Sequence, residues 1–500
     1  MFDPTSGLPR SDTPARASTE SLDQSLVRGL AWTSAAKWGS QVLSWASTLI
    51  VARILSPEDY GLVGMASIYL GLITLLSEFG LGTTVMALRD LNEEQVAQLH
   101  GFALLFGFGS FALSCLVAWP LGAFFHSAEL PAVVVAMSVA FIITSFRIVP
   151  SAILRRELRF RDLAVIDTLG ALVLAVAMIA FAWFGFRYWT LVIGGLLSSG
   201  LSTVQTLWLQ AQRTARPRVA TLRHAMAFSG RILVSRLSWY AYSSADFLVA
   251  GRILGKAALG VYDLAWTLAN VPIEKITVLI GQVALPIFAA VQHEPAEIRR
   301  YLLRLTEGLA LLTFPASFGI ALVARDLVLI FLGAKWSGAI VPLQLLAVFV
   351  GFRSVVPLFS QILNVTGDSR FSMYNSLLSA LVMPVSFYLM GTRWGTAGLA
   401  IAWMTVYPLL TLILYLRVSW RLSLPALQYL RALWPALSST VVMCAVVLSV
   451  DLMTAGHGSP GLLLGLQVGL GALAYLLMCL TVHRTRLRAF YEVIQRQRRA

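Results

Sequence analysis

Several charged and polar side chains of this sequence lie inside long hydrophobic stretches, where such groups are costly to place. Lys37 is followed by Gln41, Ser44 and Thr48 at i+4, i+7 and i+11, a spacing that aligns all four along one helix face. A charged side chain at the centre of a bilayer costs about 2.5 to 3.5 kcal/mol on insertion scales, so it normally faces a cavity or a partner. The spacing therefore predicts a wet helix face.

A later hydrophobic stretch has two polar stripes of the same kind. One stripe holds Arg231, Ser235, Ser238, Tyr242 and Asp246, and an adjacent face holds Arg236, Tyr240 and Ser243. Arg147 and Arg353 are two further cations, within or at the edge of apolar stretches. A cavity lined by these side chains would attract an anion. Because the guanidinium fork of arginine can bind two oxygens at once, a pyrophosphate group is the natural ligand.

These side chains form the predicted binding site. The expected substrate-binding cations are Lys37, Arg147, Arg236, Arg353 and Arg231, and the expected polar residues of the cavity wall are Gln41, Ser44, Thr48, Tyr240 and Tyr242. A structural alternative is that the cations pair with acidic residues and hold the helices together; the available partners are Asp167, Asp246, Asp263, Glu78 and Glu274. Arg147 and Arg353 would be ordinary snorkelling residues if they lay nearer the membrane interface.

An ion-coupled transporter also needs a carboxylate at membrane depth, where it can bind a proton or a cation. Asp246 and Asp263 are the first candidates for this role, and Glu274 is the next. The alternative for each is a salt bridge to a neighbouring arginine.

Catalytic and metal-binding motifs are missing from the sequence. It contains no H-E-x-x-H, G-x-S-x-G, C-x-x-C or P-loop pattern, and the 3 cysteines all lie in apolar runs. No large external loop is predicted that could carry the active site of a membrane glycosyltransferase or polymerase. We therefore expect a protein that is not an enzyme and that uses no metal or other cofactor.

The elements that position these residues are membrane-spanning helices. Of the 500 residues 58% are hydrophobic and 12% are charged, and the mean hydropathy is +0.76, so lipid must be the solvent. We predict an all-α membrane protein of about 14 transmembrane helices, each of roughly 20 apolar residues. The expected spans are 28–52, 60–80, 101–124, 130–152, 163–184, 188–210, 226–250, 258–283, 302–324, 338–363, 371–391, 396–416, 432–452 and 461–482. Glycines 461, 465 and 469 in the last span form a double G-x-x-x-G, which favours close helix packing.

The basic residues set the expected orientation. With the N-terminus inside, cytoplasmic segments hold 25 Lys and Arg residues and outside loops hold 7. This bias satisfies the positive-inside rule, so both termini are expected in the cytoplasm of a bacterium whose inner membrane the chain spans. It also explains the net charge of +14 without a nucleic-acid partner. Residues 1–25 are expected to be a disordered cytoplasmic tail, and 483–500 a basic amphipathic cytoplasmic tail.

An internal duplication organises the spans into two lobes. Arg53-Ile54-Leu55 followed by Gly61 matches Arg252-Ile253-Leu254 followed by Gly260 at an offset of 199. Arg147 matches Arg353 at a similar offset, within F-R-I-V-P and F-R-S-V-V-P. A parallel repeat of six helices naturally encloses a central cavity. The expected parts are 26–212 as the N-lobe, 213–420 as the C-lobe and 421–482 as two extra helices.

Four segments carry a resemblance to a known family. Ala52 to Leu62 (A-R-I-L-S-P-E-D-Y-G-L), followed by E-F-G-L-G at 78–82, resembles the polysaccharide-transporter (Wzx-type) family of oligosaccharide flippases. R-R-E-L-R-F at 155–160 and D-F-L-V-A-G-R-I-L-G at 246–255 are also similar to motifs of that family. The resemblance implies the fold of the multidrug and oligosaccharidyl-lipid exporters, in which two six-helix lobes work by alternating access.

The resemblance also implies a substrate. It predicts translocation of undecaprenyl-pyrophosphate-linked repeat units of O-antigen, capsule or exopolysaccharide across the bacterial inner membrane, beside the polymerase and export machinery of the same pathway. A multidrug or metabolite antiporter of the same superfamily and a lipid II flippase are the alternatives. An antiporter for cationic drugs should have an acidic and aromatic cavity, and the cation stripes count against it. The sugar unit, the coupling ion and the oligomeric state are not encoded in any motif of the sequence.

Overall fold

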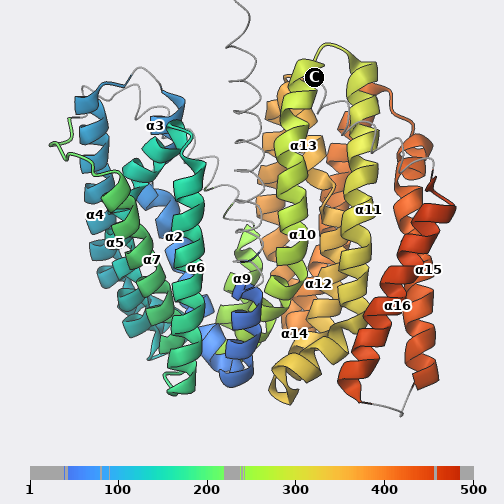
Figure 1. Ribbon diagram of the computed structural model, residues 1–500, viewed down its shortest axis with the longest axis horizontal. Helices are drawn as coiled ribbons and strands as arrows, with labels where there is room; N and C mark the ends of the chain where they lie inside the picture. The colour runs from blue at the N-terminus through green and yellow to red at the C-terminus, as the bar shows by residue number, and fades with distance from the viewer. Residues whose placement is uncertain are drawn as a thin grey trace, which may run out of the picture.

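The structure is a computed structural model that describes residues 39, 43–78, 81–88, 91–218, 237, 240, 243–454 and 459–484. The described residues fold into helices joined by short connections, without a β-strand. Figure 1 shows these helices as two groups that lie side by side, one from each half of the chain. The all-α prediction is therefore confirmed.

The N-terminal group contains a helix over Leu43–Ile54 and six labelled helices. They are α2 (Pro57–Glu78), α3 (Leu81–Ala87), α4 (Glu93–Phe125), α5 (Leu130–Arg156), α6 (Phe160–Trp183) and α7 (Trp189–Leu209). Local sequence sets where α4 begins, because Asn92 accepts a hydrogen bond from the Gln95 amide while the Gln95 side chain accepts one from Asn92. This capping box satisfies two of the N–H groups that a helix start leaves free.

The C-terminal group contains the remaining elements. They are α9 (Ala245–Val249), the π-helix η1 (Ala250–Leu254), α10 (Lys256–Ala290), α11 (Pro295–Leu327), the π-helix η2 (Val328–Leu332), the 3-10 helix η3 (Ala334–Ala339), α12 (Ile340–Arg353), α13 (Val356–Val365), α14 (Ser369–Leu422), α15 (Ala426–Thr454) and α16 (Pro460–Thr481). Helices α15 and α16 pack on α11, where the Tyr475 hydroxyl donates to the Leu311 carbonyl at 2.7 Å. They lie at the outer edge of this group (Figure 1).

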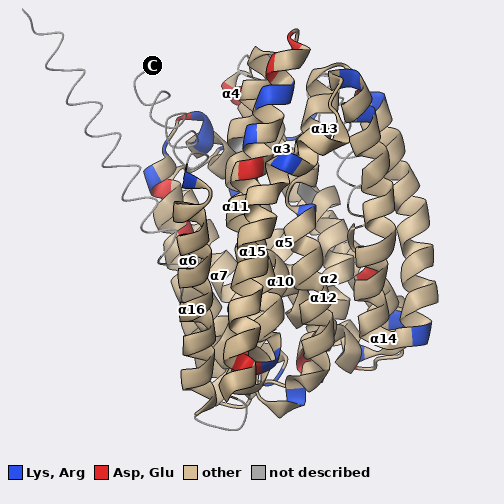
Figure 2. Cartoon of the chain, turned by 90° about the vertical axis from the view of Figure 1, so that its right-hand side faces the viewer, with Lys and Arg blue, Asp and Glu red and all other residues tan. Residues whose placement is uncertain are grey.

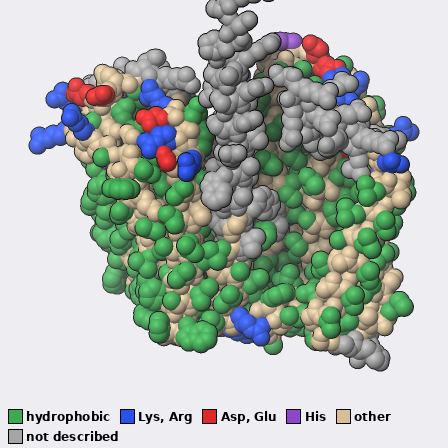
Figure 3. All heavy atoms as spheres, in the orientation of Figure 1, with side chains coloured by type: hydrophobic (Ala, Val, Ile, Leu, Met, Phe, Trp, Pro, Cys, Tyr) green, Lys and Arg blue, Asp and Glu red, His purple; other side chains and the backbone are tan. Residues whose placement is uncertain are grey.

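The helices are long and apolar enough to cross a membrane. Within the described ranges 11 helices meet that requirement. Figure 3 shows hydrophobic side chains over the middle of the visible face and charged side chains near its upper and lower edges, as expected for a protein surrounded by lipid. The chain is a multi-pass membrane protein.

Two of the expected spans are joined in one long element, and another expected span is divided into two helices. The spans expected at 371–391 and 396–416 are joined in the 54-residue α14, which is interrupted at Gly395 with φ +60°. The span expected at 338–363 is divided at Ser354 into α12 and α13. The spans expected at 28–52 and 226–250 are described only in part, at 39 and from 43 in the first and from 237 in the second, so the number 14 remains a prediction.

The last helix packs differently from the prediction. A Cβ atom added to Gly461, Gly465 or Gly469 would meet no atom within 4 Å, whereas one added to Gly471 would lie 2.7 Å from the Val447 side chain. The close approach of α16 to α15 is therefore made by Gly471. The G-x-x-x-G pattern gave the wrong residues because spacing alone does not tell which helix face meets a neighbour.

Candidate functional site

The two halves of the chain meet where α2 crosses α10 near the start of both helices. A Cβ atom added to Gly61 would lie 1.6 Å from the Lys256 carbonyl oxygen, and one added to Gly260 would lie 1.9 Å from the Pro57 carbonyl oxygen. Only glycine allows backbones to approach so closely. Gly61 and Gly260 are the matched glycines of the duplication, so the repeated segments contact each other.

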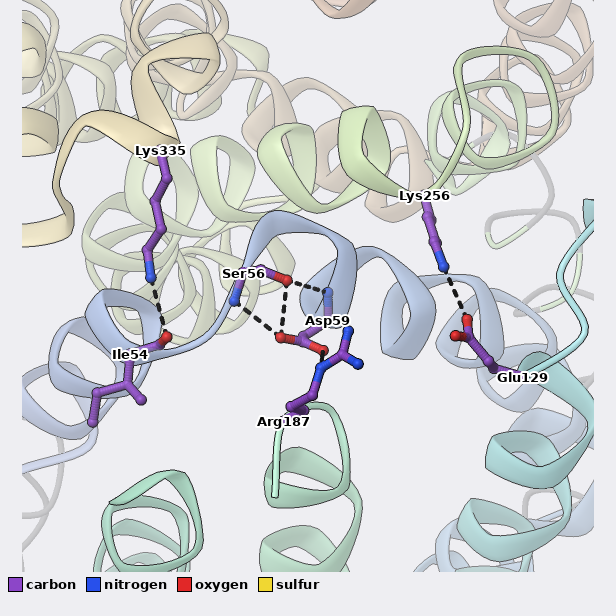
Figure 4. A network of polar contacts seen from close by, with 7 residues as sticks. All are labelled: Ile54, Ser56, Asp59, Glu129, Arg187, Lys256 and Lys335. Atoms are coloured by element: carbon purple, nitrogen blue, oxygen red, sulfur yellow. Dashed lines mark hydrogen bonds and ion pairs between the residues drawn. The ribbon is translucent and has the colours of Figure 1, made fainter. Parts of the chain in front are cut away.

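Side chains beside this crossing join the helix that ends at Ile54 to the segment between α11 and α12. Lys335 Nζ donates to the carbonyls of Arg53 at 2.7 Å and Ile54 at 3.1 Å, the second of which is drawn in Figure 4. Trp336 Nε1 donates to the Ala52 carbonyl at 2.7 Å, and Arg53 donates to the Ile330 and Phe331 carbonyls. We call these contacts the backbone clasp.

Charged pairs lie around the backbone clasp. Lys256 at the start of α10 binds Glu129 before α5 at 2.9 Å, and Arg252 contacts His126 at 2.6 Å. Asp59 accepts from the amide and hydroxyl of Ser56 at the start of α2, and Arg187 approaches its other oxygen at 3.3 Å (Figure 4). The two groups of helices are thus fastened to each other at one end, the lower end in Figure 1.

Two adjoining hollows lie between the helices, and the first of them begins beside the clasp, where the Tyr60 ring packs against Trp336 at 5.4 Å. The interlobe pocket, about 370 Å³, is walled by α2, α6 and α7 on one side and by α9 and α10 on the other, with Tyr60, Ser67 and Asp263 on its wall. The arginine pocket, about 350 Å³, is lined by Trp266, Asn270 and Glu274 of α10 and by Arg353, among others. Tyr240, Ser244 and Phe247 belong to both walls, so the two pockets share one boundary.

Arg353 ends α12 with its guanidinium in the arginine pocket. Its Nη1 donates to Asn270 Oδ1 at 3.3 Å, and its Cζ lies 5.7 Å above the centre of the Trp266 ring. Asn270 Nδ2 in turn donates to Glu274 Oε2 at 2.9 Å. Within the described part of the chain no acidic side chain forms an ion pair with Arg353. Most of its five N–H donors are therefore available to a ligand.

Arg353 also lines a third hollow, which is almost wholly apolar. This apolar pocket, about 320 Å³, lies between α11, α12, α13, α14 and α15 and is lined largely by aromatic and aliphatic side chains. Its wall includes Phe314, Phe359, Tyr415 and Leu433. The Arg353 side chain thus lies between the arginine pocket, which contains polar groups, and an apolar hollow.

Asp246, predicted as a coupling carboxylate, is fully buried. Its Oδ2 accepts hydrogen bonds from the Tyr262 hydroxyl and from Trp403 Nε1, both at 2.8 Å, and its Oδ1 accepts one from the Phe247 amide at 3.0 Å. Because Trp403 belongs to α14, the carboxylate joins three elements of the C-terminal group. Asp246 is not among the residues that line the pockets described above.

Replacing Asp246 by leucine should destabilise the protein. Leucine leaves the Tyr262 hydroxyl and the Trp403 indole without their acceptor, and each buried unsatisfied donor costs roughly 1–3 kcal/mol. The matched Asp246→Asn variant keeps an oxygen that can accept from both donors, so it should cost less. Thermal unfolding of the purified variants in detergent measures the difference. A leucine variant that melts with the wild type would contradict this role.

The other two candidate carboxylates face the pockets. Asp263 of α10 lines the interlobe pocket, and Glu274 lines the arginine pocket. Neither forms the ion pair with an arginine that was the alternative for these residues, among the pairs of the described chain. Both carboxylates can therefore interact with a solute in the pockets.

The remaining predicted residues divide into three groups. Tyr240 lies at the shared boundary and donates to the Ile68 carbonyl at 2.7 Å, which joins its helix to α2. Ser44 and Thr48 lie on the helix over Leu43–Ile54, where the Thr48 hydroxyl donates to the Ser44 carbonyl at 2.8 Å, and the half-buried Arg147 lies in α5; none of these three lines a pocket described above. Lys37, Gln41, Arg231, Arg236 and Tyr242 lie outside the described residues.

Trp266 and Asn270, the two residues that contact Arg353 in the arginine pocket, were not predicted from the sequence. Trp266 and Asn270 precede Glu274 by eight and four residues, so all three lie on one face of α10. A search for polar residues at i−4 from Glu274 would have found Asn270. Asn270 is neutral, so the intramembrane charge that indicated Glu274 did not indicate it.

The fold of this multi-pass membrane protein is one that membrane transporters have. The structure is similar to that of the lipid II flippase MurJ in an inward closed conformation, with a TM-score of 0.74, 14% identity and coverage of 91% of this chain and 100% of that one. The predicted architecture of the multidrug and oligosaccharidyl-lipid exporters is therefore confirmed at the level of the fold.

The sequence then places the chain in a family. The profile described as "Polysaccharide biosynthesis protein" matches residues 50–342, more than half of the chain, and the chain belongs to that family. It is 23% identical over 423 residues to the lipopolysaccharide biosynthesis protein WzxC of Escherichia coli (strain K12), with coverage of 83% of this chain and 85% of that one. It is 24% identical over 481 residues to the succinoglycan biosynthesis transport protein ExoT of Rhizobium meliloti (strain 1021), with coverage of 94% and 96%. The chain is a transporter and not an enzyme.

Proposed function

We propose that this protein is a flippase that moves undecaprenyl-pyrophosphate-linked oligosaccharide units of O-antigen, capsule or exopolysaccharide across the bacterial inner membrane. The observation that carries the proposal is the position of Arg353 between the arginine pocket and the apolar pocket. A lipid-linked sugar has an apolar tail and a hydroxyl-rich head joined by two phosphates. An arginine between an apolar hollow and a pocket that contains polar groups matches that order of groups.

The proposed mechanism is alternating access between two lobes. The parts are 26–212, 213–420 and the helices in 421–482, and the backbone clasp with the Gly61–Gly260 crossing holds the first two together at one end. Substrate enters the pockets from the opposite end, Arg353 binds the phosphates, and the clasp must open before the substrate can leave. We also propose Arg147, Lys37, Arg231 and Arg236 as further cations along this route.

The orientation in the membrane follows from the charges. Figure 2 shows more Lys and Arg at the upper end of the molecule, which holds the connection between α5 and α6, than at the lower end, which holds the backbone clasp. We assign the upper end and both termini to the cytoplasm by the positive-inside rule. The clasp then closes the external side. The polymerase and export machinery of the same pathway would receive the product there.

Asp263 is the carboxylate that we propose for ion coupling. It faces the interlobe pocket beside Tyr60 and Ser67, where a proton or a cation could reach it when that pocket opens. Asp246 has three donors already and serves better as a structural acceptor. Glu274 lines the arginine pocket instead.

Deletion of the gene in the source organism tests the proposed function. We expect the deletion strain to lose a surface polysaccharide and to accumulate its lipid-linked precursor, and the wild-type gene to restore both. The measurements are surface polysaccharide, extractable lipid-linked saccharide, peptidoglycan content and susceptibility to cationic drugs.

Each alternative function predicts a different result from this strain. Intact polysaccharide with increased drug susceptibility would replace the proposal with a drug antiporter. Lysis with a loss of peptidoglycan would indicate lipid II as the substrate. Loss of polysaccharide without either effect supports the proposal.

A further inference from the structure

The arginine pocket contains a cation and an anion that are held apart by one neutral side chain. The Asn270 amide lies between them, because its oxygen accepts from Arg353 at 3.3 Å and its nitrogen donates to Glu274 at 2.9 Å. The assignment of amide oxygen and nitrogen follows from these two neighbours, since a guanidinium can only donate and a carboxylate only accept. The Asn270 amide therefore forms one hydrogen bond with the Arg353 guanidinium and one with the Glu274 carboxylate.

Separation of the charges keeps both of them useful to a ligand. A direct Arg353–Glu274 pair would be bidentate, with two parallel hydrogen bonds, and would cancel much of the field that attracts phosphate. With Asn270 between them, the guanidinium keeps donors for a ligand, and the carboxylate keeps its second oxygen as an acceptor. Trp266 supports this arrangement from below, because the Arg353 guanidinium lies over its ring at 5.7 Å.

The spacing of these groups suits a particular ligand chemistry. A phosphate offers only acceptors at neutral pH, whereas a sugar hydroxyl is a donor that a carboxylate binds well. In a sugar diphosphate the two kinds of group are neighbours along one molecule. Arg353 at the end of α12 can bind the diphosphate, and Glu274 on α10 can accept from a hydroxyl of the neighbouring sugar, so the two side chains match the order of groups in the ligand.

We propose that Asn270 is a positioning residue that prevents Arg353 from pairing with Glu274, and that Glu274 binds hydroxyl groups of the sugar next to the diphosphate. This inference rests on the proposed function and adds a specificity to it. Glu274 favours a neutral sugar at that position and disfavours an acidic one, because two carboxylates repel each other in a confined pocket.

Binding of three synthetic probes to the purified full-length protein in nanodiscs tests the proposal. The probes are farnesyl diphosphate, farnesyl-diphosphate-linked glucose and farnesyl-diphosphate-linked glucuronic acid. Wild-type protein should bind the glucose probe at least about tenfold more tightly than the glucuronic acid probe. Glu274→Gln should reduce that preference to about twofold or less, and it should bind farnesyl diphosphate at least as tightly as the wild type, because a negative charge beside Arg353 is removed. Glu297→Gln is the matched control, since Glu297 pairs with Arg300 on α11, outside the pocket.

Asn270→Leu tests the positioning role. It should weaken binding of farnesyl diphosphate about tenfold, because Arg353 can then pair with Glu274. The double variant Asn270→Leu with Glu274→Gln should restore that affinity, a result that simple damage to the fold would not give.

The outcomes separate this inference from the proposed function. If wild-type protein binds none of the three probes, the proposed function fails and the inference fails with it. If it binds farnesyl diphosphate, but Glu274→Gln leaves the sugar preference unchanged or the double variant stays weak, only the inference is overturned.

Discussion

An Arg353→Gln variant should be inserted normally and yet fail to restore surface polysaccharide to the deletion strain. A charge-assisted hydrogen bond between arginine and phosphate contributes about 1.5 to 3 kcal/mol, so its loss lowers affinity about 10- to 150-fold. Glutamine can still donate to the Asn270 oxygen, so the wall of the pocket should keep its shape. The variant therefore removes the charge with little change to the packing.

Arg353→Lys separates charge from geometry in the same experiment. Lysine keeps the charge but lacks the planar fork and stacks less well on Trp266. We expect partial complementation, between the glutamine variant and the wild type. The readout is surface polysaccharide, normalised to the amount of each variant in the membrane.

The Arg353→Gln test has a matched control at an exposed arginine. Arg370→Gln makes the same change at an exposed arginine near the start of α14, outside the pockets, and should complement fully. Arg147→Gln is measured in the same experiment as a test variant and not as a control, because Arg147 is the repeat partner of Arg353. Full complementation by Arg353→Gln at normal membrane levels would remove the observation on which the proposed function rests.

The second large effect is expected at the glycine crossing. Gly61→Ala should destabilise the protein and abolish transport, because its Cβ would overlap the Lys256 carbonyl oxygen. The neighbouring atom is backbone, so α2 and α10 must move apart. Overpacking usually costs about 1–3 kcal/mol, and backbone overlap places this site at the upper end or beyond. Gly260→Ala, against the Pro57 carbonyl, should behave in the same way.

Thermal unfolding in detergent and complementation together measure this effect. Gly195→Ala in α7 is the control, because a Cβ there meets nothing within 4 Å. Alanine normally favours a helix over glycine by about 1 kcal/mol, so the control should be neutral or slightly stabilised. A Gly61→Ala variant as stable and active as the control would show that the two helices do not need this approach.

Much of the fold could be predicted because lipid imposes a simple pattern. Spans of about 20 apolar residues must be helices, since backbone groups have no water to bind. The repeat of Gly61 at Gly260 was also visible in the sequence. That the two glycines lie against each other's helices was not, because offset and spacing do not specify which faces of a duplicated pair meet.

The candidate site could be predicted only in part. Intramembrane charge identified Arg353, Asp263 and Glu274, all of which line pockets. Asp246 carried the same signal, but its donors Tyr262 and Trp403 come from α10 and α14 and could not be paired with it by periodicity. Asn270 carried no charge signal, although it joins two residues that did. Polar positions were thus predictable, and their partners across helices were not.

The backbone clasp has a consequence for how the closed end can change during evolution. Lys335, Trp336 and Arg53 donate to main-chain carbonyls at 52, 53, 54, 330 and 331. Every residue type supplies a main-chain carbonyl, so substitution at most of these acceptor positions leaves the contact in place. Only the three donor residues must keep their identity, and the residues around them can be substituted without loss of these hydrogen bonds. Closure of this end can therefore persist while relatives diverge to carry chemically different cargo.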